Sequence, residues 1–99
     1  MMVYQIQLEP QAYQDIQAAI TYYELKQKGL GNRFHTIVLN AFDTIKITPF
    51  FQIRYSEIRC YHVRPFPYLV HYKVNEDEKM IHVLGVVSTY LNPETYYFQ

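Results

Sequence analysis

The chain has 99 residues, a length that favours a single domain over residues 1–99. Nine basic and nine acidic residues give a formal net charge of zero, which argues against a dedicated nucleic-acid binder, since such proteins are usually strongly basic. The sequence has no apolar run of membrane-spanning length, and Met1–Pro10 lacks the pattern of a signal peptide, so we expect neither a membrane segment nor a secreted protein.

The N-terminal quarter predicts a strand and then a helix. Val3–Leu8 alternates well enough for a strand. Pro10 suits the first turn of a helix, where its missing N–H would be unpaired in any case. Apolar residues at helical spacing predict a helix over residues 10–28, and Gly29 is a typical C-terminal stop.

A second helix should begin near Leu30–Asn32 and end before Pro49. Its apolar stripe is continuous, and Phe34 and Val38 lie in the middle of it. Because the link between the two helices is short, we expect an antiparallel helical hairpin.

After Pro49 the pattern changes from helical to alternating. Four strands are predicted, at Gln52–Tyr55, Ile58–Val63, Phe66–Val74 and Lys79–Thr89. Short turns join them, which implies antiparallel pairing. The sequence therefore predicts an α+β fold of order β-α-α-β-β-β-β, in which an N-terminal strand precedes a helical hairpin packed on an antiparallel sheet.

Alternation divides the third of these strands into two faces. The side chains expected toward the core are those of Phe66, Tyr68, Val70, Tyr72 and Val74. The side chains expected to point outward are those of Leu69, His71 and Lys73. His71 is thus predicted to be a surface histidine that could act as a general base near neutral pH.

Basic residues are concentrated in the strand region. Arg59, Arg64 and Lys73 are the candidate partner-binding residues. Two interpretations remain open. The two arginines form ion pairs with Glu57, Glu76 or Asp77, or they border a groove that holds an acidic or amphipathic partner.

Other chemistry has little support in the sequence. The four histidines are scattered without ligand spacing, so no metal site is expected, and no cofactor motif is present. The one cysteine, Cys60, is expected to be a small buried hydrophobic residue. A single cysteine cannot form an internal disulfide, which fits a reducing cytoplasm.

An ordered set of short motifs resembles the RelE/ParE superfamily of toxins from type II toxin–antitoxin systems. The set comprises Ala12-x-x-Asp15-Ile16, Tyr22-Tyr23-Glu24, Leu30-Gly31-Asn32-Arg33-Phe34, Pro49, Ile58-Arg59, Phe66-Pro67-Tyr68, Tyr72 and Asn92-Pro93. The resemblance covers nearly the whole chain and implies the RelE/ParE-like fold. The Leu-Gly-x-Arg-Phe and Phe-Pro-Tyr patterns are closer to the ParE branch.

The resemblance implies one of two mechanisms. RelE-like members cut messenger RNA on the ribosome, whereas ParE-like members poison DNA gyrase without nuclease activity. The nuclease branch has arginines where this chain has Leu69 and Tyr90, and Ser88 and Leu91 also depart from its last segment. The weak catalytic candidates that remain are His71 and Tyr96.

The resemblance therefore implies a ParE-like cytoplasmic toxin from a toxin–antitoxin module of the kind that stabilises plasmids. It would act by protein–protein interaction, with DNA gyrase as one possible target, and a cognate antitoxin would neutralise it in a homodimeric or heterotetrameric assembly. The alternatives are a ribosome-dependent messenger RNA endoribonuclease with an altered site, and an inert relative.

Overall fold

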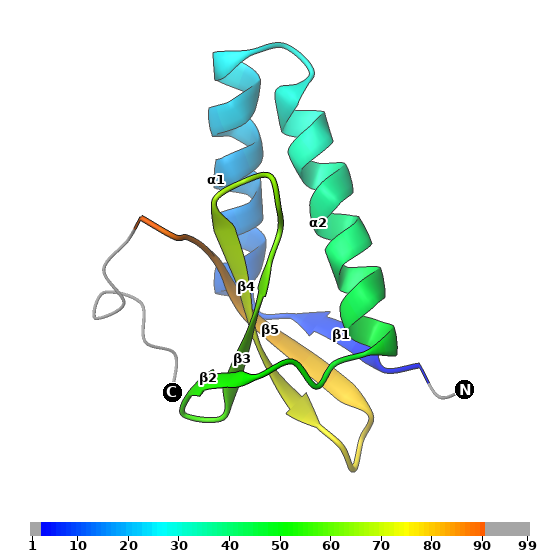
Figure 1. Ribbon diagram of the computed structural model, residues 1–99. Coiled ribbons are helices and arrows are strands. Elements are labelled where there is room, and N and C mark those ends of the chain that lie inside the picture. Colours follow the sequence, from blue (N-terminus) through cyan, green and yellow to red (C-terminus); the bar gives the residue numbers. More distant parts are fainter. Residues whose placement is uncertain (1–2, 91–99) are drawn as a thin grey trace.

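A computed structural model describes residues 3–90, which form two helices and five strands (Figure 1). The elements are β1 (Gln5–Leu8), α1 (Pro10–Lys26), α2 (Leu30–Ile47), β2 (Ile53–Tyr55), β3 (Ile58–His62), β4 (Tyr68–Asn75) and β5 (Met80–Ser88). This order confirms the predicted α+β fold class. The helices form an antiparallel hairpin that lies against one face of the sheet (Figure 1).

Local sequence signals explain both ends of the helical hairpin. Pro10 occupies the first turn of α1, where no intrahelical N–H is needed. Gly29 adopts a left-handed φ of 89° between the helices, a conformation that glycine accepts without a steric penalty. Lys26, the last residue of α1, comes two residues earlier than the predicted end of that helix.

The sheet has the strand order β1-β5-β4-β3-β2. Strands β2 to β5 pair antiparallel, as predicted, and Ser56 and Glu57 turn the β2–β3 hairpin with φ values of 42° and 64°. The N-terminal strand β1 instead pairs parallel to β5, with Ile6 opposite Ile81. The sheet is therefore mixed at one edge, where the first and last strands of the chain meet.

The stretch before β4 forms a turn rather than the start of a strand. The N–H of Val63 donates to the carbonyl oxygen of Tyr68, and the N–H of Phe66 donates back to that of Val63. Strand β4 consequently begins at Tyr68, two residues later than predicted. Phe66 is still buried, because the turn folds its ring onto the helices.

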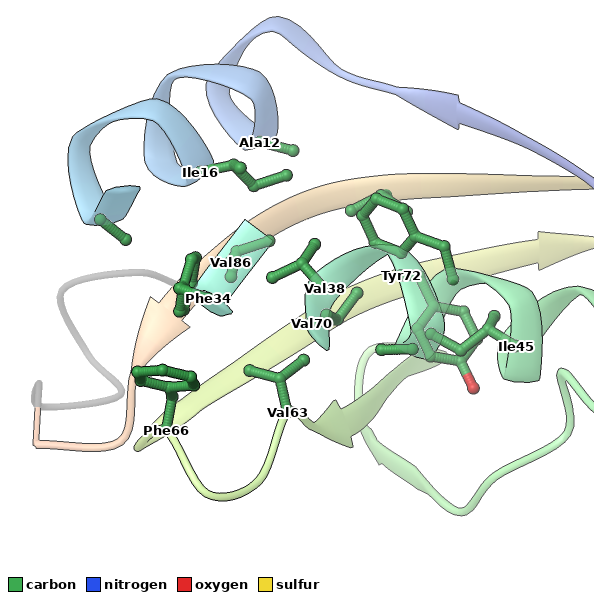
Figure 2. Packing of buried hydrophobic residues seen from close by; sticks show 14 of the residues in the cluster. Ala12, Ile16, Phe34, Val38, Ile45, Val63, Phe66, Val70, Tyr72 and Val86 are labelled. Carbon is green, nitrogen blue, oxygen red and sulfur yellow. The ribbon is translucent and has the colours of Figure 1, made fainter. Parts of the chain in front are cut away.

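The core lies between the hairpin and the sheet (Figure 2). Phe34 and Val38 of α2 are fully buried, as are Val70 and Tyr72 of β4. The predicted core face of β4 is therefore confirmed. Among residues 3–90 no helix combines the length and the apolar character that crossing a bilayer requires.

Candidate functional site

His71 is buried, which contradicts its prediction as a surface histidine. Its side chain is 1% exposed. The hydroxyl oxygen of Tyr55 lies 3.0 Å from its Nδ1, and the Sγ of Cys60 lies 3.5 Å from the same atom. Burial, and secondarily the charge of Arg54, lower the pKa of His71 to about 4. The imidazole is therefore neutral at pH 7 and closed off from substrate.

Neighbouring strands explain why His71 is covered. It lies between Val70 and Tyr72, whose side chains are part of the core cluster, so it takes the other face of the sheet, as alternation predicted. Strand β3 sets Cys60 directly opposite His71. The β2–β3 hairpin then brings the Tyr55 ring near the imidazole, with 5.9 Å between the ring centroids. The prediction that His71 lies at the surface was wrong because it assumed that the far face of the sheet is exposed to solvent.

Cys60 is half-buried, whereas the sequence predicted a small buried hydrophobic residue. Its strand lies near the β2 edge of the sheet, where less of the structure covers it. Burial nevertheless raises the pKa of its thiol to about 11. The thiol is therefore protonated at neutral pH and is a poor nucleophile.

The positions that carry arginines in nuclease relatives hold no cation here. Leu69 is half-buried on β4, opposite Val87. Tyr90 follows β5 and is 85% exposed, and Ser88 ends that strand opposite Tyr68. Neither leucine nor serine can neutralise the phosphate charge that develops during RNA cleavage. The remaining positions in this comparison, Leu91 and Tyr96, lie outside the described residues.

Arg59 is half-buried and supports the fold. Its Nη1 donates a hydrogen bond of 2.6 Å to the carbonyl oxygen of Phe51, and its guanidinium lies 5.3 Å from the centroid of the Phe50 ring. Its cross-strand partner is Tyr72, whose hydroxyl donates to the carbonyl oxygen of Pro49 at 2.8 Å. These two side chains together hold the segment between α2 and β2 against the sheet.

Arg64 is exposed in the turn that follows β3. With Ile37 and Asn40 of α2 it lines an open hollow of about 510 Å³ between that helix and β3. Among the described residues, neither Arg59 nor Arg64 forms an ion pair with any of the predicted partners Glu57, Glu76 and Asp77. Arg64 lines this hollow, whereas Arg59 does not.

Lys73 lies on the other face of the sheet, away from both arginines. It pairs with His82 across β4 and β5, and it borders the acidic turn that contains Glu76 and Asp77. The structure therefore brings Arg59 and Arg64 to the α2 side and separates Lys73 from them. The three candidate residues do not form one cationic site.

Over residues 3–90, no three His, Cys, Asp or Glu side chains are grouped as metal ligands. His82 instead lies beside a carboxylate, with 3.5 Å between its Nδ1 and the Oε1 of Glu9. His62 lies 3.0 Å from the carbonyl oxygen of Phe66 through its Nε2. These two histidines thus contact different parts of the structure.

Comparison with known proteins identifies the family. The family described as "ParE toxin of type II toxin-antitoxin system, parDE" matches residues 6–89. The chain belongs to the ParE toxin family. Its fold is also similar to a solved structure titled "Chromosomal ParDE TA system from P. aeruginosa", with a TM-score of 0.76, 11% sequence identity, and coverage of 87% of this chain and 96% of that one. No curated protein sequence matches the chain significantly.

Sequence reasoning about this ParE-family chain missed the exposed apolar side chains at the C-terminal end of α2 and just after it. Ile47 and Phe50 are each 52% exposed, and they flank the buried Pro49. The available signal was a proline followed by two phenylalanines in a predicted loop. Bulky apolar residues in a loop have no helix or strand periodicity that would direct them into a core, so they are candidates for contact with a partner.

Proposed function

We propose that this ParE-family chain is the toxin of a type II toxin–antitoxin module and acts in the cytoplasm by binding a protein target, with DNA gyrase as the first target to test. A cognate antitoxin neutralises it by binding. The family match supports the toxin assignment, and the burial of His71 carries the choice of mechanism.

The burial of His71 argues against RNA cleavage. Attack by a ribose 2′-hydroxyl requires a base within hydrogen-bond reach of that hydroxyl. The His71 ring is nearly inaccessible, and its Nδ1 already lies within 3.0 Å of the Tyr55 hydroxyl oxygen. Leu69, at the position of a nuclease arginine, supplies no cationic donor. Binding a protein target needs neither group.

Two assays, one on the purified chain and one in cells, test this function. The purified chain is added to a DNA gyrase supercoiling reaction, and the chain is separately induced in cells whose translated messages are mapped by primer extension. We expect inhibition of supercoiling and no codon-specific cleavage. Codon-specific cuts that vanish in a His71→Ala or Tyr96→Phe variant would establish the nuclease mechanism instead. Intact supercoiling together with normal growth would show an inert relative.

A further inference from the structure

A second hollow lies at the C-terminal end of α2 and is more apolar than the first. It encloses about 550 Å³, and its walls come from Tyr4, Ile47, Pro49, Phe50 and Phe51. The rings of Tyr4 and Phe50 meet edge to face, with 5.9 Å between their centroids. Ile47 and Phe50 remain half exposed at its mouth. Large apolar side chains that are partly exposed in this way are typical anchors of protein interfaces.

The two hollows share one lining residue, Phe51. We call the combined surface the α2 track. One wall is α2 from Ile37 to Ile47, roughly 15 Å of helix at 1.5 Å per residue. That length accommodates about five residues of an extended chain, at about 3.3 Å each.

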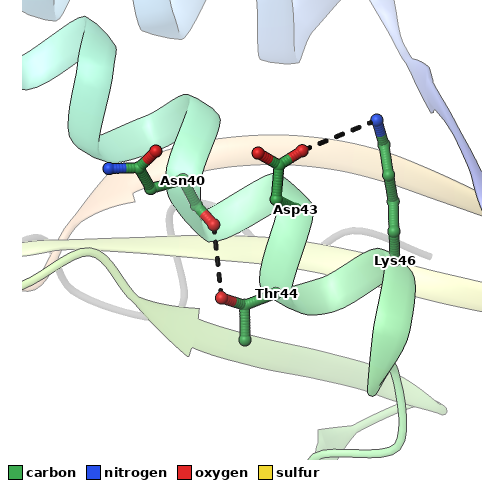
Figure 3. A network of polar contacts seen from close by, with 4 residues as sticks. All are labelled: Asn40, Asp43, Thr44 and Lys46. Atoms are coloured by element: carbon green, nitrogen blue, oxygen red, sulfur yellow. Dashed lines mark hydrogen bonds and ion pairs between the residues drawn. The ribbon is translucent and has the colours of Figure 1, made fainter.

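Two threonines line the track, one near the end of α2 and one just after it, and both donate their hydroxyls to backbone carbonyls. The Thr44 hydroxyl donates to the carbonyl oxygen of Asn40 at 3.2 Å (Figure 3), and the Thr48 hydroxyl donates to that of Thr44 at 3.0 Å. These two hydroxyls already donate to the backbone, so the wall offers fewer free donors than its sequence indicates.

Arg64 lines the track, and two further cations contact aromatic rings that line it. Arg64 lies at the first hollow, and Arg59 lies over the Phe50 ring between the two. At the second hollow, the Nζ of Lys79 lies 5.5 Å from the centroid of the Tyr4 ring. No described carboxylate forms an ion pair with any of these three. The nearby Lys46 does form an ion pair, with 3.9 Å between its Nζ and the Oδ1 of Asp43 (Figure 3).

We propose that the α2 track is the docking site for an acidic segment of the antitoxin that carries apolar anchor residues. This inference rests on the proposed function. An apolar anchor fills the hollow at Ile47 and Phe50, and carboxylates of the segment approach Arg64 and Lys79. Cations without carboxylate partners favour an acidic partner over a basic or neutral one. Burial of the half-exposed apolar side chains by the partner stabilises the complex once it has formed.

The first experiment compares two serine substitutions on one helix. Ile47→Ser removes an anchor of the track, whereas Leu39→Ser removes a similarly exposed side chain (48%) that lines neither hollow. Each variant is titrated with the protein encoded by the adjacent reading frame. We expect Ile47→Ser to bind at least tenfold more weakly, through faster dissociation, and Leu39→Ser to bind within twofold of the wild type.

A second pair of variants tests the charge. Arg64→Glu should slow association severalfold at low salt and flatten its salt dependence, while Lys28→Glu, in the exposed link between the helices, should change neither. Arg59 is left intact because it holds Phe51 in place.

Crosslinking supplies a measurement that does not depend on weakened binding. A photoreactive benzoylphenylalanine in place of Phe50 should form a covalent adduct with the antitoxin, whereas the same group in place of Tyr13 should not. Equal affinity of the Ile47 and Leu39 variants, or equal adducts at both positions, would overturn the docking site while leaving the toxin assignment intact. If the wild type itself fails to bind at micromolar concentration, both proposals fall.

Discussion

Glu24 and Gly31 join the two helices of the hairpin directly. The Oε1 of Glu24 accepts a hydrogen bond of 3.1 Å from the backbone N–H of Gly31, and the same carboxylate accepts from the N–H of Gly29 through both oxygens, at 2.9 and 3.1 Å. The carboxylate thus satisfies amides that the start of α2 would otherwise leave unpaired, and its charge complements the positive end of that helix. This contact gives a physical role to the Tyr22-Tyr23-Glu24 and Leu30-Gly31-Asn32 motifs.

Gly31→Ala should destabilise the protein. Helix propensity alone would favour alanine by about 1 kcal/mol. A Cβ at this position, however, would lie 2.5 Å from the backbone carbonyl oxygen of Ile20, so the helices would have to separate. Overpacking costs about 1–3 kcal/mol, and a clash with a backbone atom falls at the upper end of that range. After the gain in helix propensity, we expect a net loss of about 2 kcal/mol and a fall in Tm of about 10 °C.

The comparison for this variant is Gly29→Ala, where a Cβ would meet no atom within 4 Å. That substitution carries only the penalty of its left-handed φ, about 1 kcal/mol. Thermal unfolding followed by circular dichroism measures both. A Gly31→Ala variant as stable as wild type would mean that the close crossing of the helices is not required.

Phe34→Ala should remove a central part of the core. Phe34 has no exposed surface, and its ring packs against those of Tyr23, Phe66 and Tyr68 at centroid distances of 5.4, 5.1 and 5.3 Å. Truncation should cost about 3–5 kcal/mol in chemical denaturation, a large share of the stability of a small domain. Leu39→Ala on the exposed side of the same helix should stay within about 0.5 kcal/mol of wild type. Equal losses for the two variants would contradict the packing.

The helices and the core face of β4 could be predicted because their signals are local. The apolar stripe around Phe34 and Val38 and the alternation through Val70 and Tyr72 each depend on residues a few positions apart. The parallel pairing of β1 with β5 could not be predicted in this way. It joins Ile6 to a strand more than seventy residues later, and no short-range pattern encodes such a partner.

The candidate site was harder to predict because side-chain environment depends on register between strands. Alternation assigned His71 to the correct face, but its burial depends on Cys60 and Tyr55 from two other strands. The position of Arg59 likewise follows from its pairing with Tyr72, which directs it toward the segment after α2. Both facts require the register of β2, β3 and β4, which a single sequence does not specify.

Tyr72→Phe should weaken the attachment of the segment after α2. The buried hydroxyl of Tyr72 donates to the Pro49 carbonyl oxygen at 2.8 Å, and burial raises the pKa of Tyr72 to about 12, so the hydroxyl remains a donor across the working pH range. Its removal leaves that carbonyl without this donor, at a cost of about 1–2 kcal/mol in urea denaturation. Tyr13→Phe, at a 57% exposed position, is the matched control and should be neutral. A neutral Tyr72→Phe would show that this hydrogen bond does not stabilise the fold.

His71 should make the protein less stable in mild acid. The pKa of His71 is lowered from 6.5 to about 4 by burial, so between these values the unfolded chain binds a proton that the folded chain does not. The stabilisation is therefore complete above pH 6.5 and is lost as the pH falls toward 4, a change of about 3 kcal/mol. Urea denaturation at a series of pH values measures how steeply the free energy of unfolding changes with pH.

His71→Gln, which cannot titrate, should reduce this slope between pH 6.5 and 4, whereas His35→Gln on the exposed side of α2 should retain it. A His71→Gln variant with the full wild-type slope would assign the acid sensitivity to other groups and would contradict the burial of this imidazole.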